Sequence, residues 1–162
     1  MSQAKSLCVR KDTVEVELAL DGHTPRRVTL FLAEHGGHGF EHQTVLDLLE
    51  QVEPFLPARD VETGVWEAFN ARAVVWIGMS RQAMDEEAAP DELFEHRRRV
   101  RVSLAGGGSL EGEVLYSGPD GETRLVDYLN RRERIFRLWN GDRIFLVNKD
   151  SVVRIDENGH EG

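Results

Sequence analysis

The sequence predicts a mainly β fold with short helices (α+β), organised as two tandem ββαββ small-barrel modules packed on each other. Two stretches, residues 14–77 and residues 100–155, match each other in register. Both begin with apolar residues that alternate with polar ones, which is the pattern of a strand with one buried face. Dividing 162 residues in this way gives copies of roughly 60 residues, whose thin cores favour burial of one copy against the other.

The match between the two copies holds over hairpins, helices and closing strands. At an offset of 86 residues, the first-strand residues Val14, Val16 and Leu18 fall on Val100, Val102 and Leu104. The helices match at an offset of 80 and the closing strands at an offset of 78, where Asn70, Val74 and Ile77 fall on Asn148, Val152 and Ile155. The change of offset places six additional residues in the first copy, between its second strand and its helix.

The first module spans residues 13–79 and follows a flexible arm, residues 1–12. Residues 14–19 and 28–32 form a hairpin around the turn at Asp21 and Gly22. Residues 43–53 carry apolar residues on one helical face, and Pro54 and Pro57 end that helix. Residues 65–70 and 72–78 are the least polar strands of this copy, so we expect both to lie centrally in the sheet.

An acidic linker, residues 80–96, which also allows a short helix, leads into the second module, residues 97–156. Its hairpin comprises residues 100–104 and 110–116, followed by a short helix at 123–130. Residues 135–138, 144–147 and 151–155 are strands separated by turn residues, which gives this copy one strand more than the first. Residues 157–162 form a polar tail.

The net charge of −9 is distributed unevenly. Residues 13–79 carry 4 basic and 11 acidic side chains, whereas residues 97–155 carry 12 basic and 8 acidic ones. One module is therefore acidic and the other basic. Such divergence indicates modules that are complementary to each other or that take different partners.

Two stretches of the second module resemble a small barrel domain of uncharacterised bacterial proteins. They are EVLYSGPDGETRLVDYLN, residues 113–130, and RIFLVNKDSVVRI, residues 143–155. The architecture implied is similar to Sm-like or SH3-like barrels, present here as a tandem repeat. The Sm order places its helix before the strands, whereas this helix lies between strand pairs. The resemblance thus implies a fold and transfers no site residue.

Arginines of the second module are the candidate partner-binding residues. Their guanidinium groups can bind carboxylates or phosphates, and a nearby tryptophan can anchor a contact. The candidates are Arg97, Arg98, Arg99, Arg101, Arg131, Arg132, Arg134 and Trp139. The alternation around Arg99 and Arg101 equally fits a solvated strand face. The tryptophans Trp66, Trp76 and Trp139 are expected mainly in the core.

A histidine-rich loop raises the alternative of a metal site. His35, His38 and His42 are spaced closely enough to share an ion, but glycines separate them and the second module has no counterpart, so a solvated loop is favoured. No serine or cysteine stands in a nucleophile motif. We expect no enzyme activity, no cofactor and no small-molecule substrate.

The sequence favours a non-catalytic adaptor or regulatory protein that binds another protein. Cys8 is the only cysteine, and no signal peptide or long apolar run is present, so we expect a reduced cytoplasmic protein with no membrane span. Seventeen arginines against three lysines suggest a GC-rich bacterial genome. A bacterial signalling or spatial-organisation complex fits these features, and self-association through strand edges is a further expectation. An Sm-like nucleic-acid-binding protein and a metal-linked protein are the alternatives.

Overall fold

The computed structural model describes residues 11–33, 43–82, 94–118 and 124–157. The first half contains β1 (Lys11–Leu20), β2 (Arg26–Ala33), α2 (Val45–Glu50), β3 (Phe55–Asp60), β4 (Trp66–Asn70), the 3₁₀ turn η1 (Ala71–Ala73) and β5 (Val74–Ser80). The second half repeats this order with β6 (His96–Leu104), β7 (Ser109–Tyr116), α3 (Leu125–Leu129), β8 (Ile135–Asn140), β9 (Arg143–Asn148), η4 (Lys149–Ser151) and β10 (Val152–Glu157).

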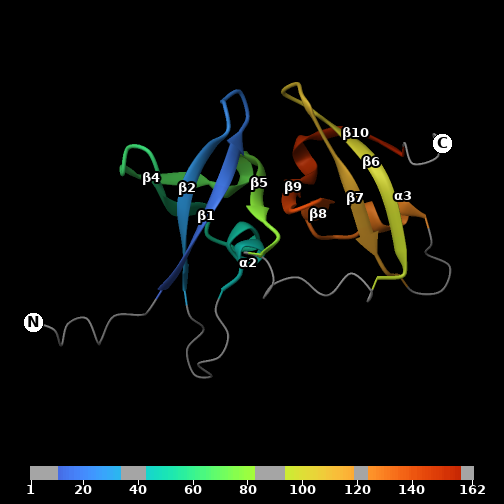
Figure 1. The fold of residues 1–162 in the computed structure, drawn as a ribbon, viewed down its shortest axis with the longest axis horizontal. Coiled ribbons are helices and arrows are strands. Elements are labelled where there is room, and N and C mark those ends of the chain that lie inside the picture. Colours follow the sequence, from blue (N-terminus) through green and yellow to red (C-terminus); the bar gives the residue numbers. More distant parts are fainter. Residues whose placement is uncertain (1–10, 34–42, 83–93, 119–123, 158–162) are drawn as a thin grey trace, which may run out of the picture.

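All ten strands belong to one antiparallel sheet in the order β10-β6-β7-β8-β9-β5-β1-β2-β3-β4. Within each half the last strand lies beside the first, and the others follow in chain order. The halves stand side by side and join where β5 meets β9 (Figure 1). The predicted mainly β fold with two short helices is confirmed. The sheet is open, with β10 and β4 at its edges, and no pairing among the described strands closes a barrel.

The seam between β5 and β9 is a wall shared by two hydrophobic cores. Ile77 lies opposite Leu146 and Met79 opposite Ile144, and all four side chains belong to the core of the first half. Trp76, by contrast, packs in the core of the second half together with Phe145 and Val147. Every residue of β5 up to Met79 is buried. Since β5 and β9 each contribute side chains to the core of the other half, each core depends on both strands.

Local sequence signals explain where the helices and turns form. Thr44 caps α2: its hydroxyl accepts from the backbone N–H of Asp47, whose carboxylate accepts in return from the N–H of Thr44. The helix is shorter than the predicted residues 43–53. Gly22 adopts a φ of 79° in the β1–β2 turn, which favours glycine. Asn70 and Asn148 accept bonds from the backbone two residues later and so begin η1 and η4.

Three expectations for the first half are corrected. The chain regains a regular strand at β3, which the sequence analysis had treated only as the end of a helix, so this half also has five strands. Residues 65–70, expected to be central, form the edge strand β4, while β5 is central as expected. The first strand, β1, begins at Lys11, within the range 1–12 that was expected to be a flexible arm. The proposed helix in the linker after residue 80 lies largely outside the described residues.

Candidate binding surfaces

The predicted arginines of the second half lie in two separate places. Arg97, Arg99 and Arg101 are exposed on the outer face of β6. Arg97 pairs with Glu113 at 2.9 Å and Arg101 with Glu111 at 2.8 Å across β7, while Arg98 lies 3.7 Å from Glu157. Neighbouring carboxylates therefore neutralise much of this strip. Exposed ion pairs of this kind contribute little stability.

The remaining predicted arginines follow α3, and two of the three bind backbone oxygens. Arg131 donates from Nη2 to the carbonyl of Ser117, and its guanidinium lies 5.1 Å from the centre of the Tyr128 ring. Arg134 donates to the carbonyl of Leu49 at 2.7 Å and so ties the second half to the first. Arg132 is exposed. These positions serve the packing of the chain as well as its surface charge.

Trp139, proposed as a partner-binding residue, is 5% exposed and packs in the core of the first half. The guanidinium of Arg81 covers its ring at 5.0 Å from the centroid. A tryptophan buried in this way does not present a face to a protein partner. Trp76 is buried too, which leaves Trp66 as the exposed tryptophan of the chain.

Arg131 and Trp139 nevertheless meet at a cavity of about 350 Å³ between α2 and the sheet of the second half. Its walls are mostly apolar or aromatic, formed by Leu46, Phe94, Leu115, Tyr116, Tyr128, Ile135 and Trp139. Its charged lining consists of Arg131, Arg137 and Lys149, with Glu133 as the carboxylate. We call this site the cationic cavity. Of its three cations, Arg131 was among the predicted partner-binding residues.

Burial shapes the ionisation of the groups around the cationic cavity. Burial lowers the pKa of the Lys149 ammonium, whose Nζ donates to the carbonyl of Arg131 at 3.1 Å; the Glu133 carboxylate opposes the shift. Burial also raises the pKa of the Tyr128 hydroxyl, against the effect of the positive charge on Arg137. Both shifts have the direction that burial of these groups produces.

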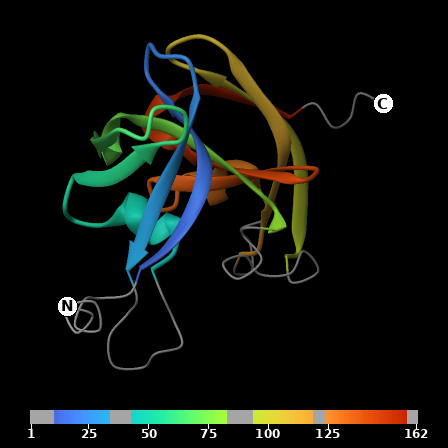
Figure 2. The ribbon, with the colours of Figure 1, turned by 60° about the vertical axis from the view of Figure 1, so that its left-hand side comes forward.

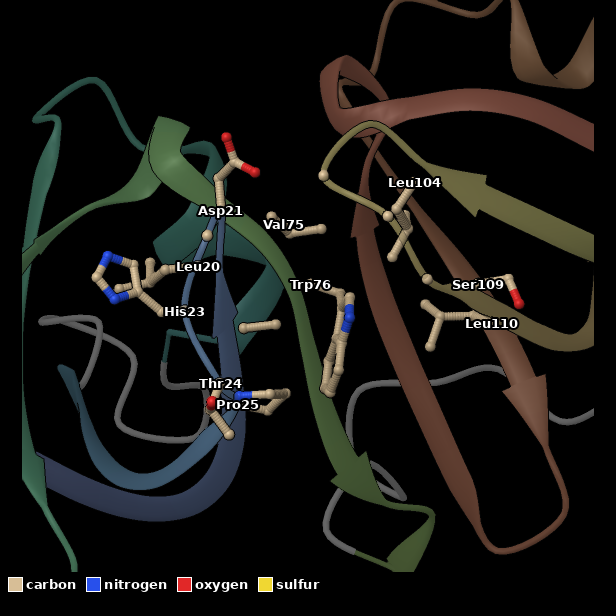
Figure 3. A pocket seen from close by; sticks show the side chains of 15 residues that line it. Leu20, Asp21, His23, Thr24, Pro25, Val75, Trp76, Leu104, Ser109 and Leu110 are labelled. Atoms are coloured by element: carbon tan, nitrogen blue, oxygen red, sulfur yellow. The ribbon is translucent and has the colours of Figure 1, made fainter.

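A second hollow, about 500 Å³ in volume, separates the β1–β2 turn from the β6–β7 turn. The two turns lie side by side at one end of the molecule (Figure 2). Trp76 projects between them, with Leu104 and Leu110 on the opposite wall (Figure 3). Asp21, His23 and Ser109 also line this hollow, but Figure 3 shows Ser109 on the other turn and the His23 ring directed away from it. The arrangement is not that of an assembled nucleophile and base.

The first half exposes aromatic side chains, among them Trp66, which was expected mainly in the core. Trp66 is 58% exposed, and its ring stacks on that of Phe31 with centroids 4.7 Å apart and planes at 19°. The guanidinium of Arg59 lies 5.8 Å from the Trp66 centroid, and Arg59 is the cross-strand partner of Trp66. Phe55 and Pro57 continue the exposed side of β3. We call these five residues the aromatic face.

Ion pairs beneath the aromatic face fix its strands. Arg26 of β2 pairs with Asp60 of β3 at 3.2 Å and with Glu67 of β4, and its guanidinium lies 5.1 Å from the centroid of the Phe69 ring. The backbone N–H of Thr63 holds the pKa of the Asp60 carboxyl below its ordinary value, with help from Glu62 and Arg26. The aromatic side chains are thus carried by three strands that these ion pairs connect.

The metal alternative lies outside the described residues, because His35, His38 and His42 all fall in residues 34–42. Within the described part of the chain, no group of three or more histidine, cysteine or carboxylate side chains is placed to hold an ion. In that same part, no helix is long and apolar enough to cross a bilayer.

Comparison with protein-family models, with curated proteins and with solved structures finds no match for this chain. The likeness to Sm-like or SH3-like barrels stays a prediction from the sequence. Any functional assignment must therefore be argued from the surfaces themselves.

Proposed function

We propose that this chain is a non-catalytic adaptor or regulatory protein that binds another protein through its aromatic face. The observation that carries the proposal is the stacked pair of Phe31 and Trp66 at the edge of the sheet, with Trp66 more than half exposed. Tryptophan and arginine are the residues that most often dominate protein interfaces. Here Arg59 lies beside Trp66 and the pair stands on ordered strands, so a partner would meet a preformed contact.

The distribution of exposed apolar residues supports the same surface. Of the exposed large hydrophobic residues in the described part of the chain, most lie on β3, on β4 or in the turn between them: Phe55, Val61, Val65 and Trp66. Apolar side chains that gather on one hairpin mark interaction sites more often than scattered single residues do.

The wider context of this proposal comes from the sequence. In this proposal each half is a curled small-barrel module. An adaptor made of two such related halves suits a bacterial cytoplasmic complex for signalling or spatial organisation. Opposite net charges on the halves allow each to meet a different partner. The Sm-like nucleic-acid-binding alternative draws on the β6 arginines, whose pairing with Glu111 and Glu113 weakens it.

A capture experiment with matched variants tests the proposal. The immobilised protein is exposed to cell lysate with and without nuclease, alongside Trp66→Ser and Val153→Ser. Val153 is 68% exposed on the opposite edge strand, β10, so its replacement removes apolar surface elsewhere. We expect a protein that survives nuclease, is lost with Trp66→Ser and is kept with Val153→Ser. Equal capture by both variants would contradict the aromatic face, and capture of RNA alone would favour the nucleic-acid alternative.

A further inference from the structure

The cationic cavity is lined mainly by residues of the second half, whereas the aromatic face belongs to the first half, and the cavity has its own chemistry. A cavity of about 350 Å³ is within the range of small-molecule sites, which are concave, mostly apolar and furnished with a few polar groups. The apolar part comes from both halves, with Leu46 on α2 and Ile135 on β8. The polar part is dominated by cations, because Arg131, Arg137 and Lys149 outnumber Glu133.

Arg137 is the most informative of these cations. Its Nε is buried and has no hydrogen-bond partner among the described residues. A buried donor that makes no hydrogen bond costs free energy, more so when it belongs to a charged group. Such groups are rare in folded proteins, and each calls for an explanation such as a ligand or a functional role.

Arg134 is a second arginine with a buried Nε, but it differs from Arg137 in its other contacts. Its Nε is buried without a partner as well, but its Nη2 donates to the carbonyl of Leu49 and joins α2 to the second half. That bond gives Arg134 a structural role. No bond or ion pair of this kind ties Arg137 to another described residue, while its charge lies close enough to act on the pKa of Tyr128. Among the described residues, Arg137 therefore has no carboxylate paired with its charge at this mostly apolar wall.

We infer that the cationic cavity binds a small molecule carrying an oxyanion, a phosphate or a carboxylate, on an apolar body. The guanidinium of Arg137 and the ammonium of Lys149 bind the oxyanion, and the apolar wall around Ile135 and Leu115 takes the body of the ligand. A guanidinium matches either oxyanion because its parallel N–H groups donate to two oxygens at once. This site is independent of the aromatic face and of the proposed protein partner.

The test uses phenyl phosphate and benzoate as probes, with phenol as the neutral counterpart of the same shape. Amide signals of the labelled full-length protein are followed by two-dimensional NMR during each titration. We expect phenyl phosphate, benzoate or both to shift the signals of residues 131–137 and 149, and phenol to leave them in place. The two anions separate a phosphate site from a carboxylate site.

Matched variants then assign the binding to Arg137. Arg137→Met keeps an apolar stem, and we expect it to weaken binding of the active probe by roughly tenfold or more, the effect of losing charge-assisted hydrogen bonds. Arg99→Met removes the same charge from the exposed face of β6 and should change binding by about twofold or less, because solvent and salt screen distant charges. Lys149→Met is the second variant, for use if Arg137→Met does not fold, and it should also weaken binding.

The results that overturn the inference are equally definite. It fails if neither anion shifts the signals around the cavity, if phenol shifts them as strongly as the anions, or if Arg137→Met binds the probe as tightly as Arg99→Met does. None of these results bears on the capture experiment with Trp66→Ser, so failure of this site leaves the adaptor proposal standing.

Discussion

At the scale of single residues, two asparagines at equivalent positions have diverged in their surroundings. Asn70 and Asn148 both begin a 3₁₀ turn by accepting a backbone bond, from Arg72 at 2.9 Å and from Asp150 at 3.0 Å. Asn148 is 1% exposed, and its Nδ2 also donates to the carbonyls of Arg72 and Val74 in the first half, at 3.3 and 3.0 Å. Asn70 is exposed. The buried asparagine thus holds the two halves together.

We expect Asn148→Ala to destabilise the protein by about 2 kcal/mol or more. The substitution removes a cap and leaves two carbonyl oxygens of the other half without their donor. Asn70→Ala is the matched control and should cost about 1 kcal/mol or less, since it removes only the cap. Free energies of unfolding from urea titration measure both. Equal losses in the two variants would show that the bonds across the seam contribute nothing.

Whether a tryptophan of this chain is buried depends more on the place of its strand in the sheet than on the residue type. Trp66 and Trp139 both occur in strands with apolar neighbours, and both were expected in the core. Trp139 lies on β8, inside the sheet, and is buried, whereas Trp66 lies on the edge strand β4 and is exposed. Alternation along one strand shows which residues share a face. It does not show whether another layer covers that face, so the aromatic face could not be located from the sequence.

At the scale of elements, β7 must come unusually close to β8. A Cβ atom at Gly112 would lie 2.5 Å from the backbone oxygen of Trp139 and 3.0 Å from Cγ of Leu138. Gly78 in β5 is also crowded, but its nearest neighbour, at 2.6 Å, is the end of the flexible Arg143 side chain. The two glycines therefore differ in what would have to move.

We expect Gly112→Ala to destabilise the protein by about 1–3 kcal/mol, the usual cost of overpacking a tight site. The backbone of β8 must shift to admit the methyl group. Gly78→Ala should cost clearly less, because Arg143 can swing aside into solvent. Thermal unfolding followed by circular dichroism compares the pair. A Gly112→Ala variant as stable as the unchanged protein would mean that the two strands are free to separate.

Element types were largely predictable, while boundaries and one strand were not. The hairpins follow from alternation, and α2 follows from its apolar face and its cap. β3 was missed because Pro54 and Pro57 were treated only as the end of a helix. Pro57 is tolerated since β3 pairs with β2 only through Ala58, Arg59 and Asp60, so the proline lies beyond that ladder.

At the scale of the whole molecule, the two edge strands of the sheet, β4 and β10, lack the apolar residues that bury the seam between β5 and β9. The repeat offset of 78 residues shows which edge residues are equivalent to those of the seam. On β10, Arg154 is equivalent to Trp76 and Asp156 to Gly78. On β4, Glu67 is equivalent to Phe145. The two halves were expected to pack on each other as modules; in the structure they join edge to edge in one sheet through the buried apolar strands β5 and β9. The strands at the free edges of the same sheet carry charges instead, and charged edge strands oppose further pairing.

We therefore expect the protein to remain monomeric, against the self-association that exposed strand edges alone would suggest. Head-to-tail pairing of β4 with the β10 of a second copy, in the register of the seam, would set Asp156 opposite Glu67, and like charges directly opposite are destabilising. Restoring the seam residues, with Arg154→Trp and Asp156→Gly together, should produce oligomers that grow with concentration in sedimentation velocity experiments.

A matched control distinguishes pairing of strand edges from nonspecific association through an exposed tryptophan. Arg154 and Asp156 form an ion pair at 2.8 Å on the edge strand β10, and so do Arg101 and Glu111 on the next two strands, β6 and β7. Arg101→Trp with Glu111→Gly makes the same kind of change, yet it should leave the protein monomeric because β6 and β7 are each already paired on both sides. Association of both double variants would attribute the effect to exposed tryptophan. A monomeric edge variant would show that the repeat register of the seam cannot be extended beyond one chain.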